Sequence, residues 1–250
     1  MSNVNAESFD CDPVRVTSRV AAIPRLLLPQ CCELCAARTC GSLLCAACAE
    51  ALPRVGAACP VCALPSAAEG ACGACLALPP PYAATVAAFA YAFPIDRLLQ
   101  RIKYGGRIAL AQWAGAALAA ALHGPRARRT GRPRPDCIVA LPLAAARQRD
   151  RGFNQASEIA ARVARDTGLP LATPLARITA GPPQTALAWA ERRRNVRGAF
   201  AVRAPVGGAR IALVDDVMTT GATLAEAART LLHAGAEQVE CWVVARTLPP

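Results

Sequence analysis

Two kinds of hydrophobic pattern alternate along the chain: short unbroken apolar runs, and longer stretches with helical spacing. An unbroken run is typical of a strand buried on both faces of a parallel sheet, whereas apolar residues three and four apart indicate a helix. Strands are predicted at Tyr82–Ala92, Asp136–Leu141 and Ile211–Val214, and helices at Ile95–Tyr104, Arg107–His123, a segment from Gln155 through Ala164, and Leu224–Ala234. This alternation predicts an α/β fold.

The run Ile211–Val214 leads directly into two carboxylates, Asp215 and Asp216, and then into a turn rich in Thr and Gly. Ligands of open α/β sheets bind at the carboxyl ends of strands, where this turn is expected to lie. The amides at the start of the next helix and the positive end of its dipole suit a phosphate. The residues expected to hold it are Thr219, Thr220, Gly221, Ala222 and Thr223.

The two aspartates need a different partner, because carboxylates at contact range repel phosphate. Ribose hydroxyls, Mg²⁺ or both would satisfy them. Thr223 and Glu226 have the spacing of a capping box, which predicts that the helix begins at Thr223. The alternative is an ordinary strand, turn and helix with solvated aspartates, which an isolated Asp-Asp pair would favour. Apolar run, acid pair, turn and cap together favour a sugar-phosphate site.

An internal repeat of cysteines precedes the α/β pattern. The spacing C-x2-C-x9-C-x2-C occurs at Cys32, Cys35, Cys45 and Cys48 and again, 27 positions later, at Cys59, Cys62, Cys72 and Cys75. Two C-x2-C turns complete the tetrahedral S4 site of structural zinc, so one or two Zn²⁺ ions are predicted. The first pair could also share a metal with the third. Redox motifs are the alternative, but they predict one pair after a strand instead of four in a Pro- and Ala-rich segment.

Composition and local sequence patterns indicate the size of the core, the domain boundaries and the location of the protein. A chain of 250 residues, 54% hydrophobic and 18% charged, can bury a full core. The Pro-rich stretch at 76–81 marks a boundary, which predicts an N-terminal extension at 1–30, a Cys-rich zinc-ribbon segment at 31–78 and an α/β domain at 82–250. The first residues lack the basic start and apolar run of a secretory signal, and Ile108–Leu122 is too short for a membrane span. A cytoplasmic protein is expected.

Arginine-rich segments give the chain a formal net charge of +11. Composition favours a solvated linker at Gly124–Pro135, and the alternative is an anion or nucleic-acid patch that lacks aromatic residues for base stacking. Arg147, Arg149 and Arg151 form either a solvated loop or an anion site. The long polar connection Pro182–Phe200 is predicted to be a flap over a pyrophosphate.

The sequence IALVDDVMTTGAT at Ile211–Thr223 resembles the signature loop of phosphoribosyltransferases. In that family the acid pair holds the ribose hydroxyls of phosphoribosyl pyrophosphate (PRPP), and the turn cradles the 5-phosphate. Purine-salvage members often carry an acidic residue where this chain has Thr219. A purine acceptor is therefore not implied.

The order of the segments is similar to that of the ComF family of phosphoribosyltransferase-like proteins, which are associated with competence for DNA uptake. The resemblance runs from about Cys31 to Arg246 and rests on the Cys-rich segment, RDRGFNQ at 149–155, QTALAWAERRRNVRGAF at 184–200 and the terminal VDDVMTTGAT. Many members have a histidine where this chain has Ala144. The resemblance implies a type I phosphoribosyltransferase fold, which is a parallel sheet with helices on both faces. It also implies a pyrophosphate loop near Leu141–Ala144, a mobile loop within 182–198 and a PRPP loop at 215–223.

Two functional hypotheses follow. In the first, Mg²⁺ bridges pyrophosphate and ribose oxygens, and Asp215 and Asp216 act as catalytic residues that position the ribose. The groups assigned to the pyrophosphate and the flap are Lys103, Arg147, Arg149, Arg151, Gln184, Arg193 and Arg194. In the second, the chain is a non-catalytic module that binds single-stranded DNA through the zinc ribbon and basic loops. No general base is assigned, because His123 and His233 fall near helix ends.

Overall fold

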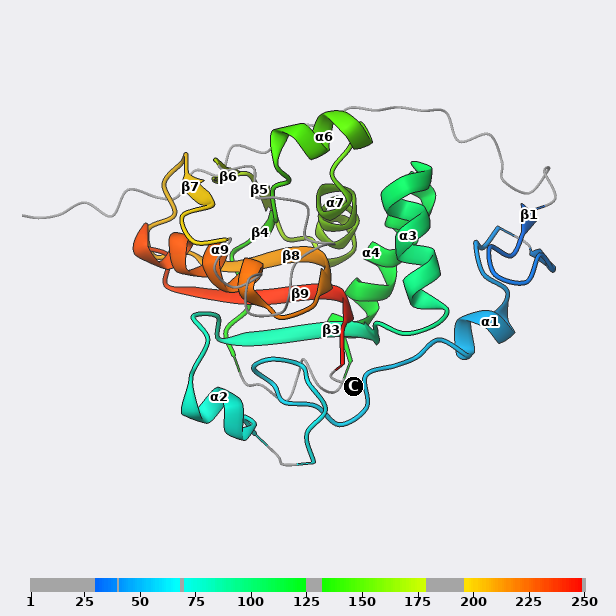
Figure 1. The fold of residues 1–250 in the computed structure, drawn as a ribbon, viewed down its shortest axis with the longest axis horizontal. Coiled ribbons are helices and arrows are strands. Elements are labelled where there is room, and N and C mark those ends of the chain that lie inside the picture. Colours follow the sequence, from blue (N-terminus) through cyan, green and yellow to red (C-terminus); the bar gives the residue numbers. More distant parts are fainter. Residues whose placement is uncertain (1–29, 40, 68–69, 125–131, 179–195, 249–250) are drawn as a thin grey trace, which may run out of the picture.

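The computed structural model describes residues 30–39, 41–67, 70–124, 132–178 and 196–248. Its centre is a five-stranded parallel sheet in the order β3-β9-β8-β4-β5. The strands are β3 (Ala84–Ala90), β4 (Cys137–Ala140), β5 (Leu171–Ala172), β8 (Arg210–Met218) and β9 (Gln238–Arg246). Helices cover both faces of the sheet (Figure 1), which confirms the predicted architecture.

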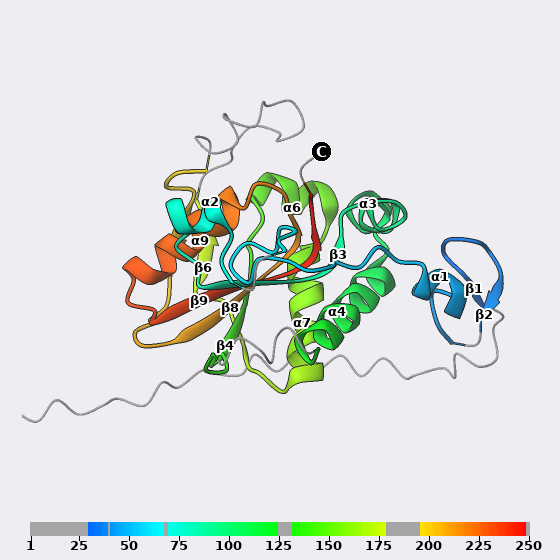
Figure 2. The ribbon, with the colours of Figure 1, turned by 90° about the horizontal axis from the view of Figure 1, so that it is seen from below.

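The two faces of the sheet carry separate hydrophobic cores. On one face lie α3 (Ile95–Gly105), α4 (Ile108–Leu122) and α7 (Gln155–Thr167), and on the other lies α9 (Ala222–His233), as Figure 2 shows. Helix α3 buries Ile95, Leu98, Leu99 and Ile102, the spacing that places four side chains on one helix face. The predicted helices therefore form, and their apolar sides pack on the sheet.

Helices α4 and α7 approach each other closely at Gly115. A Cβ at this position would lie 2.6 Å from Cβ of Arg162 and 2.8 Å from the carbonyl oxygen of Ile159. Only a residue without a side chain allows this approach, which brings α7 against β4 and β8. None of the helices in the described part of the chain has the length and hydropathy needed to cross a bilayer.

Two elements beside the sheet differ from the prediction. The arginine-rich segment after β4 is a short helix, α6 (Ala145–Arg151), where a polar loop is predicted. An antiparallel ribbon of β6 (Leu175–Arg177) and β7 (Phe200–Val202) is absent from the prediction, because its pairing joins segments far apart in sequence. The intervening residues 179–195, with Gln184, Arg193 and Arg194, lie outside the described residues.

The strand with the acid pair also differs in detail. Strand β8 continues through Met218, so Asp215 and Asp216 lie inside the strand and not in the turn. The predicted capping box is wrong: α9 begins at Ala222, its N-cap is Gly221, and no side chain caps it. Glu226 instead accepts a hydrogen bond from the backbone N–H of Gly198 at 2.8 Å and pairs with Arg229.

The cysteine-rich segment contains β1 (Gln30–Cys31), β2 (Arg38–Thr39), α1 (Ala46–Glu50) and α2 (Gly73–Ala77). In Figure 1 it passes from a lobe beyond α3 to the free edge of β3. There the N–H groups of Ala90 and Thr85 donate to the carbonyl oxygens of Pro53 (2.8 Å) and Pro60 (3.0 Å). The segment thus satisfies hydrogen-bonding groups of an edge strand. The domain boundaries proposed from the sequence stay a prediction.

Candidate functional site

The acid pair lies at the carboxyl end of the central strand β8, and the lysine singled out in the sequence lies beside it. Lys103, near the end of α3, places Nζ 2.9 Å from Oδ2 of Asp216. Asp216 is buried, while Asp215 is partly exposed and accepts a hydrogen bond at Oδ1 from the N–H of Asp216 at 2.8 Å. One lysine therefore offsets the charge of one of two adjacent carboxylates.

The pKa values of Asp215 and of Lys103 are both raised. Burial, and then the neighbouring charge of Asp216, raise the pKa of Asp215 to about 8. Burial opposes the charge on Lys103, but the carboxylates of Asp216 and Asp215 outweigh it and raise the lysine pKa. The pKa of Asp215 lies above neutral pH, so this carboxyl favours its protonated form and would ionise when a cation approached.

The turn after the acid pair adopts a conformation that depends on Gly221. Its φ is +79°, and a Cβ here would lie 2.7 Å from Cε of Met218 and 3.1 Å from the hydroxyl oxygen of Tyr82. Thr220 Oγ1 accepts a hydrogen bond from the N–H of Ala222 at 3.2 Å. The turn residues 219–221 and the first turn of α9, with Ala222 and Thr223, therefore lie directly beyond the acid pair, at the helix end that attracts anions.

A cleft of about 330 Å³ opens beside Lys103 and is lined by Lys103, Tyr104, Gly106, Arg147, Asp150 and Arg151. The guanidinium of Arg151 lies 5.6 Å from the centre of the Tyr104 ring. Of the three arginines predicted to bind an anion, Arg147 and Arg151 line this cleft, whereas Arg149 is exposed and does not line it. The structure thus brings α3 and α6 together around one cationic cleft.

Sequence reasoning missed Arg177, at the end of β6. Burial, and then the charge of Arg147, lower its pKa, while the carboxylate of Asp215 partly offsets this. Its guanidinium also lies 5.6 Å from the centre of the Phe200 ring on β7. Arg177 thus lies close enough to Arg147 and Asp215 for both to shift its pKa. The sequence carries no local signal for this, because the β6–β7 pairing positions it.

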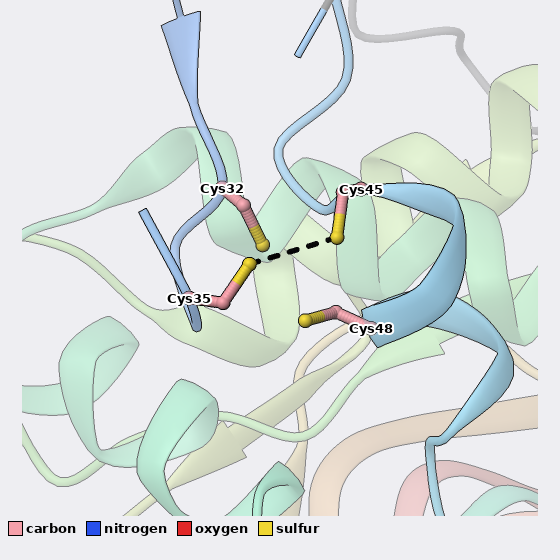
Figure 3. A group of neighbouring side chains, drawn as sticks. All are labelled: Cys32, Cys35, Cys45 and Cys48. Carbon is pink, nitrogen blue, oxygen red and sulfur yellow. Dashed lines mark hydrogen bonds between the residues drawn. The ribbon is translucent and has the colours of Figure 1, made fainter. Parts of the chain in front are cut away.

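The eight cysteines of the repeat form two separate groups in chain order: Cys32, Cys35, Cys45 and Cys48, then Cys59, Cys62, Cys72 and Cys75. Sharing of a metal between the first and third pairs is therefore not seen. Within each group all four sulfur atoms lie within 4.8 Å of one another. Figure 3 shows the sulfur atoms of the first group pointing toward a common centre.

The sulfur spacing fits a tetrahedral metal. The Sγ atoms of Cys35 and Cys45 are 3.7 Å apart, as are those of Cys62 and Cys72. A tetrahedron with Zn–S bonds of about 2.3 Å has edges of about 3.8 Å. Burial raises the pKa of Cys32, but hydrogen bonds from the backbone N–H groups of Cys35, Cys45 and Leu34 outweigh it and lower the pKa to about 6. Both groups could hold zinc, with thiolates as ligands.

Two histidines, two cysteines of the core and the basic segment remain to be placed. His123 and His233 are exposed at helix ends, and Cys137 and Cys241 are buried in the core. Of the basic segment 124–135, residues 125–131 lie outside the described residues.

A parallel sheet with an acid pair and a Thr/Gly turn at the end of its central strand defines a phosphoribosyltransferase-like protein. The phosphoribosyl transferase domain family matches residues 152–248. A purine phosphoribosyltransferase structure from Pyrococcus horikoshii is 18% identical, covers 65% of this chain and 77% of its own, and has a TM-score of 0.32.

Relatives that extend into the cysteine-rich segment narrow the class. The DNA utilization protein YhgH of Salmonella typhi is 38% identical over 82% of this chain and 91% of the relative. Competence protein F of Haemophilus influenzae is 33% identical over 70% of this chain and 78% of the relative. The chain belongs to the ComF family, whose members combine a phosphoribosyltransferase fold with a cysteine-rich segment.

Proposed function

We propose that this protein binds PRPP with Mg²⁺ at the carboxyl end of β8. The observation that carries the proposal is the arrangement there: Lys103 pairs with Asp216, Asp215 lies next to it, and the turn 219–223 opens α9 just beyond. The carboxylates suit ribose hydroxyls and a hard cation, and the turn suits a 5-phosphate. The two ends of one phosphorylated pentose would thus contact opposite sides of one strand tip.

The cationic cleft completes the proposed site. Lys103, Arg147 and Arg151 line it, and their charges suit a pyrophosphate group. Asp215 and Asp216 would hold Mg²⁺, which would supply charge neutralisation for the pyrophosphate. Lys103, which pairs with Asp216 in this structure, would turn to the pyrophosphate and stabilise its negative charge. Arg149, Gln184, Arg193 and Arg194 keep their predicted pyrophosphate and flap roles within this proposal.

Isothermal titration of Mg²⁺·PRPP into wild type and Asp216→Asn tests the site. Each charge-assisted contact contributes about 1.5–3 kcal/mol, so the variant should bind at least about tenfold more weakly. Asp136→Asn is the matched control, because Asp136 pairs with Arg210 at the start of β8, the opposite end of the sheet, and should bind as wild type does. Equal affinity of all three proteins, or no binding by wild type, would contradict the proposal.

We propose a role in DNA uptake as the biological setting, with direct binding of single-stranded DNA as a second candidate function. The relatives' names, DNA utilization protein and Competence protein F, and the net charge of +11 support it. Neutralised phosphates release counterions, so affinity for an oligonucleotide should fall steeply with salt, and deletion of residues 124–135 should flatten that slope. Undetectable or salt-independent binding would remove this candidate.

A further inference from the structure

Arg246 connects the second cysteine group to the turn that follows the acid pair. It ends β9, directly opposite Met218 of β8, and is only 3% exposed. Its Nε donates to the carbonyl oxygen of Cys62 at 2.8 Å, and its Nη1 donates to the carbonyl oxygen of Met218 at 2.8 Å and to that of Thr219. One guanidinium thus binds one carbonyl of a metal-ligand turn, one at the end of β8 and one at the start of the turn 219–223.

The turn that contains Cys62 is itself fixed to the sheet. Thr85 on β3 donates through its N–H to the carbonyl oxygen of Pro60 at 3.0 Å and through Oγ1 to that of Val61 at 2.7 Å. Val61 packs both against the cysteines and against the core on the α9 face. The metal-ligand turn therefore has a defined position relative to the sheet. Arg246 links this turn to Thr219 through its hydrogen bonds to Cys62 and Thr219.

Arg246 also brings a positive charge close to the turn 219–223. Within the described residues the polar contacts of Arg246 are carbonyl oxygens, and no carboxylate forms an ion pair with it. This buried guanidinium places a positive charge beside the turn proposed to receive a phosphate, and also near the thiols of Cys62 and Cys75. The hydroxyl of Tyr82 lies against Gly221 and so contacts the same turn.

We propose that Arg246 is a positioning residue that couples the second cysteine group to the turn 219–223, so that metal bound at Cys59, Cys62, Cys72 and Cys75 orders the phosphate-binding backbone. The role of the turn rests on the proposed PRPP function, but the coupling itself does not. The first cysteine group is expected to lack this coupling. Its charged contacts run from Glu33 to Arg101 and Arg107 on the α3–α4 side.

Hydrogen exchange of the ligand-free, zinc-loaded protein tests the coupling. Arg246→Gln removes the guanidinium fork, and exchange of the amides in 217–224 should rise at least about tenfold while zinc content stays unchanged. Arg101→Gln is the matched control, because Arg101 is one of two arginines that pair with Glu33 beside the first group, and the substitution should leave these amides unchanged. Exchange in Arg246→Gln equal to that in Arg101→Gln would overturn the proposal.

Two further variants keep the test decisive if Arg246→Gln does not fold. Arg246→Lys retains the charge and loses the fork. Thr85→Val removes the Oγ1 hydrogen bond to Val61 and so loosens the metal-ligand turn without changing a metal ligand or Arg246. Both should speed exchange of 217–224 by a smaller factor than Arg246→Gln. Wild-type exchange in both variants would overturn the coupling.

Ligand titration separates this role from general stabilisation. Ribose 5-phosphate would contact the turn, whereas Mg²⁺·pyrophosphate would contact the cationic cleft. Arg246→Lys should therefore weaken ribose 5-phosphate several-fold and leave Mg²⁺·pyrophosphate unchanged, whereas equal weakening of both would assign Arg246 a merely structural role. If wild type binds neither ligand, the proposed PRPP function fails, and the exchange result still decides the coupling.

Discussion

The two cysteine groups share one sequence spacing, yet they pack against opposite sides of the protein. Cys32 and the neighbouring Leu44 and Leu52 join the core of the α3, α4 and α7 face. Cys59, Cys62 and Cys75 form a small core of their own that meets the α9 face through Val61. A repeat in sequence therefore does not imply a repeat in role, because the surface on which each copy docks decides what it can influence.

The polar contacts of the two groups differ in the same way. Glu33, which follows Cys32 of the first group, pairs with Arg101 and Arg107, whose side chains are 52% and 54% exposed. The second group is fixed by the buried Arg246 and by Thr85. Exposed ion pairs are weak and screened by salt, whereas buried hydrogen bonds to a charged group are costly to break. Perturbing the second group should therefore affect the turn 219–223 more strongly than perturbing the first group.

The largest effect is expected from loss of a metal ligand. Cys45 and Cys72 occupy the same repeat position and are both partly buried, so Cys45→Ser and Cys72→Ser form a matched pair. Structural zinc contributes about 10–16 kcal/mol to folding of such segments, so each variant should lose one zinc and local order. Only Cys72→Ser should also weaken Mg²⁺·PRPP, as zinc analysis and titration would measure. Equal weakening of Mg²⁺·PRPP binding by Cys45→Ser would contradict the different roles of the two cysteine groups.

A smaller effect is expected in the pH dependence of stability. The folded pKa of Asp215, about 8, exceeds its ordinary value of 3.8, so folding favours the protonated form. Its contribution is complete below pH 4 and is lost as the pH rises through 8. Asp215→Asn keeps the acceptor for the N–H of Asp216 and should be more stable than wild type at pH 8, by on the order of 2 kcal/mol for this partly exposed carboxyl.

Denaturant unfolding of wild type and Asp215→Asn at pH 4 and pH 8 measures this difference, which should vanish at the lower pH. Cys45→Ser, with the α9 side intact, should respond to Asp215→Asn as wild type does. A constant difference at both pH values would show that folding does not shift the pKa of Asp215.

The smallest effect is expected at Glu33, which anchors the first group. Glu33→Gln removes the charge that pairs with Arg101 and Arg107, and it should cost about 1 kcal/mol or less because both arginines are largely exposed. Thermal unfolding should show this loss at low salt and little of it at high salt. A salt-independent loss of several kcal/mol would mean that the first group is held as tightly as the second.

Local patterns in the sequence predict much of the fold and part of the candidate site. The apolar run before Asp215 and the helical spacing in α3 depend on neighbours in sequence, and both elements form as predicted. The cysteine grouping likewise follows chain order. Lys103 is assigned to the pyrophosphate from the sequence, but its contact with Asp216 depends on the packing of α3 beside β8.

The parts that the sequence did not predict depend on contacts between distant segments. Glu226 has the spacing of a capping residue, but its carboxylate instead accepts a hydrogen bond from the N–H of Gly198 and pairs with Arg229. Arg177 acquires its neighbours from the β6–β7 ribbon. Arg246 follows the apolar run CWVVA in the sequence, and only the β8–β9 register and the cysteine segment reveal its partners.

A crystal structure with saturating Mg²⁺ and PRPP tests the central claim most directly. The account predicts the 5-phosphate on the amides of 219–223, ribose hydroxyls at Asp215 and Asp216, and Lys103 moved from Asp216 toward the pyrophosphate. A structure in which Lys103 still closes on Asp216 and the phosphate lies elsewhere would contradict it.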